Sequence, residues 1–407
     1  MKSVKLLIRY TVFFQHNVKK IEAFLLLFAV ISVAAFGQRP NVIVIYTDDQ
    51  GTMDLGALGT EDLLTPNMDR IVRDGVLFRQ FYASPICSPS RGSLLTGKVL
   101  QRIGLPGNAG SSKRSPGLPG NEYTMAEMFK SVGYATAHIG KWHVGYEPDM
   151  LPNAQGFDHS FGHLVGCIDN YSHFYFWNGP NRHDLYENGE RVFRNGEFFP
   201  DLMVAEASRF IQKHRRDPFF IYLAFNMPHY PYQGDEQWLQ YYDQRNVPYP
   251  RNLYNAFVST LDERVGQVLG LLDSLDLYNN TIIVLQSDNG HSVEERAHYG
   301  GGYAGVYRGA KQCLFEGGIR VPAAISWPRT IPGGQQRNQL AANVDWMPTL
   351  AELCEIPLDT AKLDGKSLGD LLGDNHGKSP HATFCWQFKD MWAVRKGNWK
   401  LLGNPFD

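Results

Sequence analysis

Four oxygen-bearing side chains stand in two adjacent pairs that are far apart in the sequence. Asp48 and Asp49 form the first pair, and Asp288 and Asn289 form the second. Three carboxylates and one amide oxygen are the hard ligands that calcium and magnesium prefer, whereas zinc would call for several histidines beside them. Either pair alone is also common in turns after strands, so the metal interpretation requires that the two pairs meet in space.

Five basic side chains form a second group of candidates. They are Arg91, Lys141, His143, His229 and Lys311. So many positive groups around one cation would repel each other unless an anionic ligand joined them. Together they predict a pocket for a tetrahedral oxyanion. Singly, each has a simpler interpretation, as a solvated lysine or as a histidine that only makes structural hydrogen bonds.

Cys87 begins the segment Cys87-Ser-Pro-Ser-Arg91, whose spacing is rare in a chain with five cysteines. Pro89 suits the first position of a helix, where its missing N–H costs nothing. An anion near Cys87 would then meet free backbone N–H groups and the positive end of the helix dipole. The alternative is an ordinary buried cysteine. A cysteine phosphatase is excluded, because its Cys-x5-Arg motif would need arginine in place of Ser93.

Apolar runs and helical segments alternate along most of the chain. Strands are predicted at 41–46, 76–82, 134–138, 219–225, 281–286 and 321–326. Helices are predicted at 68–74 and 125–131, and a glycine suited to a helix C-cap closes each of them. This alternation predicts an α/β fold with a large, mainly parallel sheet covered by helices on both faces.

A group with useful chemistry follows each of five predicted strands. In chain order these groups are Asp48-Asp49, Cys87, Lys141 with His143, His229, and Asp288-Asn289. Ligands of open α/β sheets bind outside the carboxyl ends of the strands. We therefore expect these groups to converge on one pocket.

Composition excludes several classes of protein. The chain has 407 residues, of which 43% are hydrophobic, and this is enough for a large core and excludes a disordered protein. Its formal net charge of -2 gives no general attraction to nucleic acid or to an anionic membrane, so no nucleic-acid partner is expected. The five cysteines are too few and too irregularly spaced for a disulfide scaffold or a Cys-x-x-Cys zinc site.

The N-terminal region has the pattern of an export signal. Lys19 and Lys20 precede the uncharged run 23–35, and Ala35-Phe36-Gly37 offers small residues at the usual cleavage spacing. This run is shorter than the roughly 20 residues that a membrane-spanning helix needs. We therefore expect a cleaved signal peptide at 1–37, no stable membrane insertion, and a periplasmic, extracellular or lumenal location.

Two segments resemble signatures of the type I sulfatases of the alkaline phosphatase superfamily. The first is Cys87-Ser-Pro-Ser-Arg91 continued to Gly97, and the second runs from Gly133 to His143. Pro228-His229-Tyr-Pro231 and the run 311–322 follow in the order that this family has. The resemblance extends over about residues 40–402, and it implies an alkaline phosphatase-like mixed sheet between helices, with a small C-terminal α+β subdomain.

The resemblance also implies a mechanism. A separate maturation enzyme would oxidise Cys87 to Cα-formylglycine, whose hydrate is the nucleophile in this family. One Ca2+ ion, rather than Mg2+, would be held by the four residues Asp48, Asp49, Asp288 and Asn289. Arg91 and Lys141 would orient the formylglycine, and Lys311 would bind the sulfate. His229 would be the acid for the leaving alcohol, and His143 the base for sulfate release.

Domain boundaries follow from the same resemblance. We expect the signal peptide at 1–37, the catalytic α/β domain at 38–375, and the start of the C-terminal subdomain, with strands at 382–402, at 376–407. Members of the family continue past the strand near Lys396, so the subdomain is expected to be truncated. The segment 146–200 is rich in His, Asn, Gly and aromatic residues without clean periodicity, and it is expected to be a long surface insertion.

The predicted substrate is a sulfated carbohydrate of the glycan or glycosaminoglycan type, which makes the protein a sulfuric ester hydrolase. The expected substrate-binding residues are Trp177, His291, Arg296 and His298. Other residues of the same two segments could stack on sugar rings or contact hydroxyls: Tyr171, His173, Phe174, Tyr175, Phe176, Arg182, His183, Glu294 and Glu295. A packed insertion and a solvated loop are the alternatives for these segments.

Two other functions remain open at the level of the sequence. A phosphatase or phosphodiesterase of the same superfamily would normally use serine or threonine as nucleophile and two metal ions. Here the place of the second metal is expected to be taken by Lys141, His143, His229 and Lys311. The other alternative is a catalytically silent, glycan-binding relative, against which the intact set of acidic and basic groups argues.

Overall fold

The protein is described by a computed structural model that covers residues 39–112, 114–176, 181–373 and 376–406. The predicted signal peptide at 1–37 and Trp177 lie outside the described residues. Within the described ranges, no helix combines the length and the apolar character that crossing a membrane would require.

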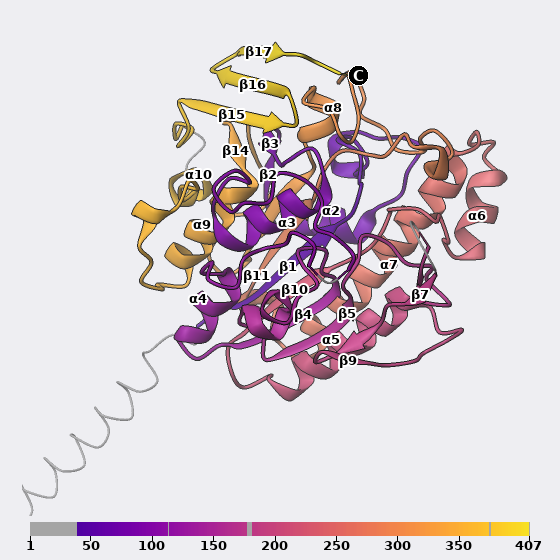
Figure 1. The fold of residues 1–407 in the computed structure, drawn as a ribbon, viewed down its shortest axis with the longest axis horizontal. Helices are drawn as coiled ribbons and strands as arrows, with labels where there is room; N and C mark the ends of the chain where they lie inside the picture. Colours follow the sequence, from indigo (N-terminus) through magenta and orange to yellow (C-terminus); the bar gives the residue numbers. More distant parts are fainter. Residues whose placement is uncertain (1–38, 113, 177–180, 374–375, 407) are drawn as a thin grey trace, which may run out of the picture. The chain divides into compact units, whose positions relative to one another are not determined.

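The main sheet places five parallel strands at its centre (Figure 1). They are β11 (Thr281–Ser287), β1 (Asn41–Thr47), β10 (Phe219–Ala224), β4 (Ala135–Lys141) and β5 (His159–His163). Each is hydrogen-bonded to the next in this order, and the register of β1 sets Val42 opposite both Phe220 and Ile282. Strands covered on both faces are expected to be almost continuously apolar, and β1, β10 and β11 are mainly apolar, whereas β4 and β5 contain several polar residues.

Other strands complete the sheet on both sides and make it mixed. On one side lie β12 (Ala323–Ser326), antiparallel to β11, then β2 (Gly75–Phe78) and β13 (Gln335–Arg337). On the other side lie β8 (Tyr186–Glu187) and β9 (Glu190–Arg191). Two small pairs stand apart, β3 (Phe81–Tyr82) with β14 (Ala341–Ala342) and β6 (Phe174–Tyr175) with β7 (Arg182–His183). The predicted fold class, a large mixed and mostly parallel sheet, is confirmed.

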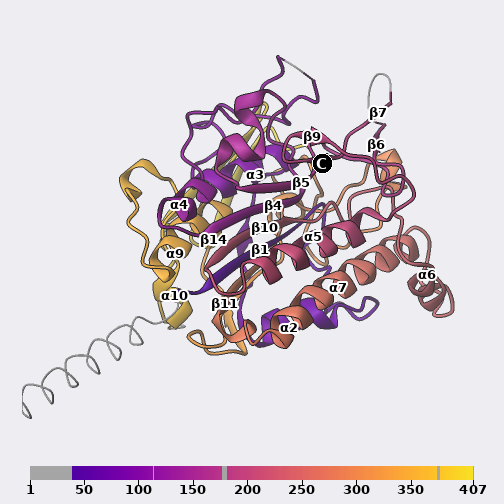
Figure 2. The same cartoon turned by 90° about the horizontal axis from the view of Figure 1, so that it is seen from below.

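Helices cover both faces of this sheet (Figure 2). One face carries α2 (Pro66–Arg73), α5 (Phe199–Lys213) and α7 (Arg251–Ser274). The other carries α3 (Cys87–Thr96), α4 (Met125–Ser131) and α9 (Trp346–Leu353). The remaining described α-helices are α6 (Glu236–Asp243), which packs on α7, and the short α8 (Glu316–Ile319) and α10 (Gly369–Gly373).

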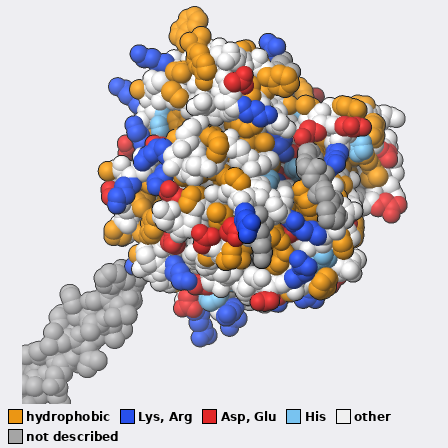
Figure 3. Space-filling model, viewed as in Figure 1, with side chains coloured by type: hydrophobic (Ala, Val, Ile, Leu, Met, Phe, Trp, Pro, Cys, Tyr) orange, Lys and Arg blue, Asp and Glu red, His pale blue; other side chains and the backbone are white. Residues whose placement is uncertain are grey.

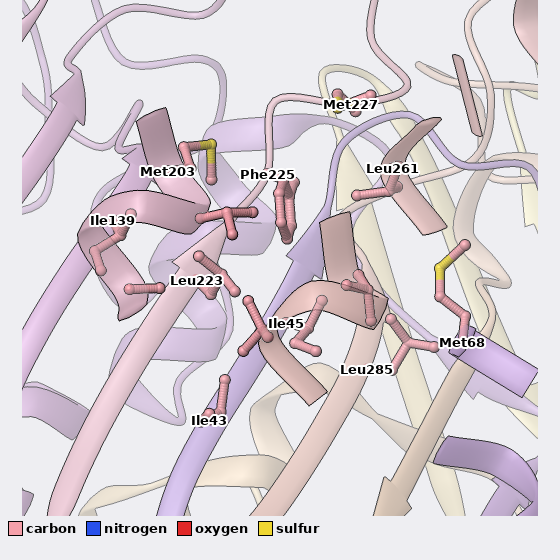
Figure 4. Packing of buried hydrophobic residues seen from close by; sticks show 14 of the residues in the cluster. Ile43, Ile45, Met68, Ile139, Met203, Leu223, Phe225, Met227, Leu261 and Leu285 are labelled. Atoms are coloured by element: carbon pink, nitrogen blue, oxygen red, sulfur yellow. The ribbon is translucent and has the colours of Figure 1, made fainter. Parts of the chain in front are cut away.

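The alternation of side chains along the strands divides the core into two layers. Ile43 and Ile45 of β1 point to the α5 and α7 side and belong to the same core cluster as Met203 and Leu261 (Figure 4). Val42 and Val44 point to the opposite layer, which contains Phe129 of α4 and Trp346 of α9. Successive residues of a strand face opposite sides of the sheet, so one strand supports both layers and holds its carboxyl end rigidly between them.

Several predicted elements differ in detail from the structure. The predicted strand 76–82 is divided into β2 and β3, which belong to different sheets. Helix α4 has the predicted bounds, and Thr124 and Glu127 form a capping box at its start. Helix α3 begins at Cys87 rather than at Pro89. The largest difference is the segment 146–200, because it is not only a surface insertion: its strand β5 joins the main sheet beside β4.

A separate antiparallel sheet follows near the end of the chain. It consists of β15 (Thr383–Phe388), β16 (Met391–Lys396) and β17 (Trp399–Gly403). These strands agree with the strands predicted at 382–402. Its buried face, with Trp386, Phe388 and Met391, packs against Tyr82 and Ile319. On the face of the molecule seen in Figure 3, acidic and basic side chains are mixed, in keeping with the small formal net charge.

Candidate active site

The two acidic pairs meet at the carboxyl ends of β1 and β11. These neighbouring strands end in register, with Thr47 opposite Ser287, so the residues after them lie side by side. The backbone N–H of Asp49 donates to Asp288 Oδ1 at 3.1 Å, and Asn289 Nδ2 donates to Asp49 Oδ1 at 2.7 Å. Single ligand atoms of Asp48, Asp49, Cys87 and Asp288 all lie within 4.8 Å of one another. The convergence expected from the sequence is therefore present.

This cluster fits one hard cation. Its carboxylates are completely or almost completely buried, and a buried negative charge is costly unless it is paired or bound to a metal. Asn289 adds a buried Oδ1 that has no hydrogen-bond partner among the described residues. Three carboxylates and an amide oxygen form an all-oxygen set of the kind that binds Ca2+ or Mg2+.

Each carboxylate also has a basic partner. Lys141 Nζ lies 2.6 Å from Asp48 Oδ2, and Lys311 Nζ lies 2.8 Å from Asp49 Oδ2. The guanidinium of Arg91 donates from Nε and Nη2 to Asp288 Oδ2, at 3.2 and 2.9 Å. Arg91 Nη1 donates in addition to the carbonyl oxygen of Lys141, at 3.1 Å. The acidic and basic groups predicted from the sequence thus form one interlocked network.

Burial and charge set the protonation of the basic groups. Burial disfavours the charged form of Lys311, but the combined attraction of Asp49, Cys87 and Asp48 outweighs it and raises the pKa of the lysine well above its usual value. Burial lowers the pKa of His229 to about 3, against the opposing attraction of Asp49. Burial, together with the charge of Lys141, lowers the pKa of His143 well below its usual value. The site therefore holds charged lysines beside neutral imidazoles.

The two histidines are placed differently. His229 Nδ1 lies 2.7 Å from the carbonyl oxygen of Tyr230, which assigns the hydrogen to Nδ1, and its Nε2 lies 3.6 Å from Asp49 Oδ2. His143 has a left-handed backbone, with φ of 53°, and a buried Nδ1 without a partner among the described residues. A Cβ at Gly166 would lie 2.8 Å from the ring of His143, so only glycine leaves room for this imidazole.

Cys87 lies at the N-terminus of α3, beside the acidic cluster. Its Sγ is 3.5 Å from Asp48 Oδ1, and the side chain is buried. Burial raises the pKa of the thiol well above its usual value. A thiolate is the reactive form of cysteine, so the unmodified side chain is a poor nucleophile in this environment.

A cavity of about 370 Å³ opens above these groups. Its wall includes Cys87, His143, His229 and Lys311 of the predicted set. Tyr175 and Glu294, predicted more generally as sugar contacts, also line it. The remaining lining residues were not predicted: Ile86, Asn108, Ala109, Ser111, Gly166, Cys167, Tyr230 and Gln312. Among these, Ile86, Tyr230 and Gln312 adjoin predicted residues in the sequence, and the others had no signal there.

Three of the four predicted substrate-binding residues, His291, Arg296 and His298, lie outside this cavity wall, and the fourth, Trp177, lies outside the described residues. His291 is buried, and its carbonyl oxygen accepts a hydrogen bond from the backbone N–H of Lys311. His298 Nδ1 lies 2.7 Å from Tyr249 Oη, and the guanidinium of Arg296 lies 5.9 Å from the ring centre of Phe176. None of these three lines the cavity described above. Their role in substrate binding, like that of Trp177, stays a prediction.

Comparison with known proteins identifies the family. A family model described as Sulfatase matches residues 40–356, so the chain belongs to the sulfatase family, and the resemblance found in the sequence is confirmed. Arylsulfatase J of Mus musculus is 32% identical over 395 residues, which are 90% of this chain and 65% of that protein. N-acetylgalactosamine-6-sulfatase of Sus scrofa is 34% identical over 372 residues, which are 84% and 68% of the two chains. The chain thus spans about two thirds of the length of these relatives.

Solved structures with a similar fold are also found. The crystal structure of Ps i-CgsB matches with a TM-score of 0.82 and 29% identity, over 90% of this chain and 84% of that one. The same protein in complex with k-i-k-neocarrahexaose matches with a TM-score of 0.81. In family and fold, the chain is a sulfatase, and the predicted enzyme class is confirmed at this level.

Proposed function

We propose that this chain hydrolyses sulfate esters of a sulfated carbohydrate, with a formylglycine hydrate formed from Cys87 and one bound calcium ion. The observation that carries the proposal is the place of Cys87, on the wall of a cavity between a buried carboxylate cluster and the basic groups Lys311, His229 and His143. The relatives named as N-acetylgalactosamine-6-sulfatase, and the carrahexaose complex of Ps i-CgsB, support a carbohydrate substrate.

Four residues would hold the metal, and their chemistry fits calcium better than a softer ion. Asp48, Asp49, Asp288 and Asn289 provide the ligand oxygens, and calcium would supply Lewis-acid polarisation of the sulfate at this place. Arg91 and Lys141 bridge the cluster and keep Asp48 and Asp288 in place around residue 87.

The modification of Cys87 would provide a nucleophile that can be regenerated after each reaction. A formylglycine hydrate supplies two hydroxyls, one to attack sulfur and one from which the aldehyde can be restored, whereas a serine would remain as a stable ester. The thiol of unmodified Cys87 is buried, has a raised pKa and supplies no such pair of hydroxyls. Conversion requires a separate maturation enzyme as a partner, and export through the predicted signal at 1–37 would bring the mature protein to its substrate.

The basic residues would divide the remaining work. Lys311, charged and at the cavity wall, would bind a sulfate oxygen. His229 would deliver a proton from Nε2 to the leaving alcohol, and the negative charge of the sulfate would help this imidazole to gain that proton. His143, neutral and with an unpartnered buried nitrogen, would accept a proton during sulfate release.

A phosphatase of the same superfamily is the second candidate, but the lysines argue against it. Lys141 and Lys311 pair with Asp48 and Asp49 at 2.6 and 2.8 Å, and there they would repel a second metal ion.

The test compares the hydrolysis of 4-nitrophenyl sulfate with that of 4-nitrophenyl phosphate, in the presence of calcium and after chelation. We expect sulfate turnover that depends on calcium. Faster phosphate turnover would favour the second candidate, and turnover of neither ester would favour a silent glycan-binding protein.

A further inference from the structure

One wall of the cavity carries a negative charge, although its other functional groups suit an anion. Glu294 lines the cavity together with Lys311 and His229. An acidic group is not needed to bind sulfate, and it opposes the entry of an anion. We therefore expect this carboxylate to interact with the part of the substrate that is not sulfate.

The carboxylate of Glu294 is held in place by neutral donors. Tyr230 Oη donates to its Oε2 at 2.9 Å, and Ser292 Oγ donates to the same oxygen at 3.0 Å. Gln312 Nε2 donates to Oε1 at 3.2 Å. Among the described residues, no ion pair neutralises this side chain. The cavity wall thus presents a fixed negative charge that no basic group compensates directly.

The geometry leaves capacity for a ligand. A carboxylate has about four acceptor positions, and three donors occupy this one, with a single donor on Oε1. A sugar hydroxyl can donate to the free position, whereas a second sulfate or a carboxylate on the same ring has no hydrogen to donate and is repelled. Repulsion of a wrong substrate is a common source of specificity.

We propose that Glu294 is a specificity-determining residue, which selects a substrate whose sulfated ring is otherwise neutral and presents a free hydroxyl, and which disfavours a ring with a second anionic group. This inference rests on the proposed function and narrows its substrate class to monosulfated, hydroxyl-bearing rings. Tyr230 and Gln312, which adjoin His229 and Lys311 in sequence, would set the position of the carboxylate relative to the sulfate.

The test uses the full-length mature enzyme and the inhibition of 4-nitrophenyl sulfate hydrolysis by galactose 6-sulfate and galactose 2,6-disulfate. We expect the wild type to bind the monosulfate at least about tenfold more tightly, and we expect Glu294→Gln to reduce this ratio to about threefold or less. Glu294→Asp, which keeps the charge, should retain most of the preference. Glu295→Gln is the matched control, because this neighbouring glutamate is exposed and lies outside the cavity lining.

The ratio of the two inhibition constants separates specificity from a merely structural role. Loss of the hydrogen bonds alone would weaken both sugars equally and leave the ratio unchanged, which would overturn the inference. Equal binding of the two sugars by the wild type, or no binding of either, would also overturn it. The shift of the melting temperature by each sugar is a second readout, so the inference can still be judged if no sulfate ester is hydrolysed and the proposed function fails.

Discussion

Replacement of Arg91 by methionine tests whether the buried network is held by charge. The guanidinium is fully buried, donates twice to Asp288 Oδ2 and lies 3.5 Å from Asp48 Oδ1. Methionine fills similar space but leaves both carboxylates without this partner. Removal of one member of a buried ion pair costs about 3–5 kcal/mol, a large part of the 5–15 kcal/mol that typically stabilises a domain.

The assay is thermal and chemical unfolding in the presence of a chelator, followed by addition of calcium. We expect Arg91→Met to lower the melting temperature by roughly 5–15 °C. Calcium brings positive charge to the same carboxylates, so it should stabilise the variant more than the wild type.

The stability of the variant should also depend on pH. Burial and the neighbouring Asp48 already raise the pKa of Asp288, and loss of Arg91 raises it further. A carboxyl with a raised pKa in the folded state contributes stability at low pH that is lost as pH rises through that pKa, so the variant should lose more stability than the wild type as the pH is raised from 5 to 7.

A surface arginine provides the control. Arg102 forms a 2.8 Å ion pair with Asp364, but its side chain is 47% exposed, and exposed pairs contribute about 0–1 kcal/mol. Arg102→Met should therefore melt close to the wild type. Wild-type stability of Arg91→Met in chelator, or an equal response of variant and wild type to calcium, would refute the view that charge holds the cluster together.

Three further predictions concern the proposed reaction. Asp288→Ala should remove both bound calcium and activity, and metal analysis that finds one calcium per chain in an inactive variant would assign Asp288 another role. Cys87→Ser should abolish turnover of 4-nitrophenyl sulfate while changing the melting temperature little, because the change is small; full activity would exclude the formylglycine mechanism. Tyr175→Ala should lower kcat/KM about tenfold on a sulfated saccharide and leave 4-nitrophenyl sulfate nearly unchanged, since this ring lines the cavity and its Oη accepts a hydrogen bond from Ser111, which is not one of the proposed sulfate-binding groups. An equal loss on both substrates would place Tyr175 in the sulfate site.

The sequence predicts the centre of this protein well for a physical reason. Strands such as β1 and β11 are buried on both faces, so they appear as apolar runs of strand length. Residues directly after such strands are positioned by the sheet itself, and Asp48 and Asp288 could therefore be placed together from spacing alone.

Features that depend on tertiary contacts were not predictable in this way. Strand β5 has the sequence His-Ser-Phe-Gly-His, which carries no strong strand signal, and it forms because it lies against the edge of β4. Part of the cavity wall was unpredictable for a related reason: Asn108 and Ser111 come from a loop, whose side chains have no fixed relation to a strand end. His291 is buried and does not line the cavity, which its place just after β11 could not reveal, and its role in substrate binding stays a prediction.

The mass of the peptide that contains Cys87 tests the central claim most directly. The protein should be produced with a formylglycine-generating enzyme, digested, and compared with protein made without that enzyme. Conversion of cysteine to the aldehyde lowers the mass by about 18 Da by simple composition. We predict this loss only in the co-produced protein, together with calcium-dependent sulfatase activity. Full sulfatase activity in protein whose Cys87 peptide retains the mass of cysteine would contradict the proposed mechanism.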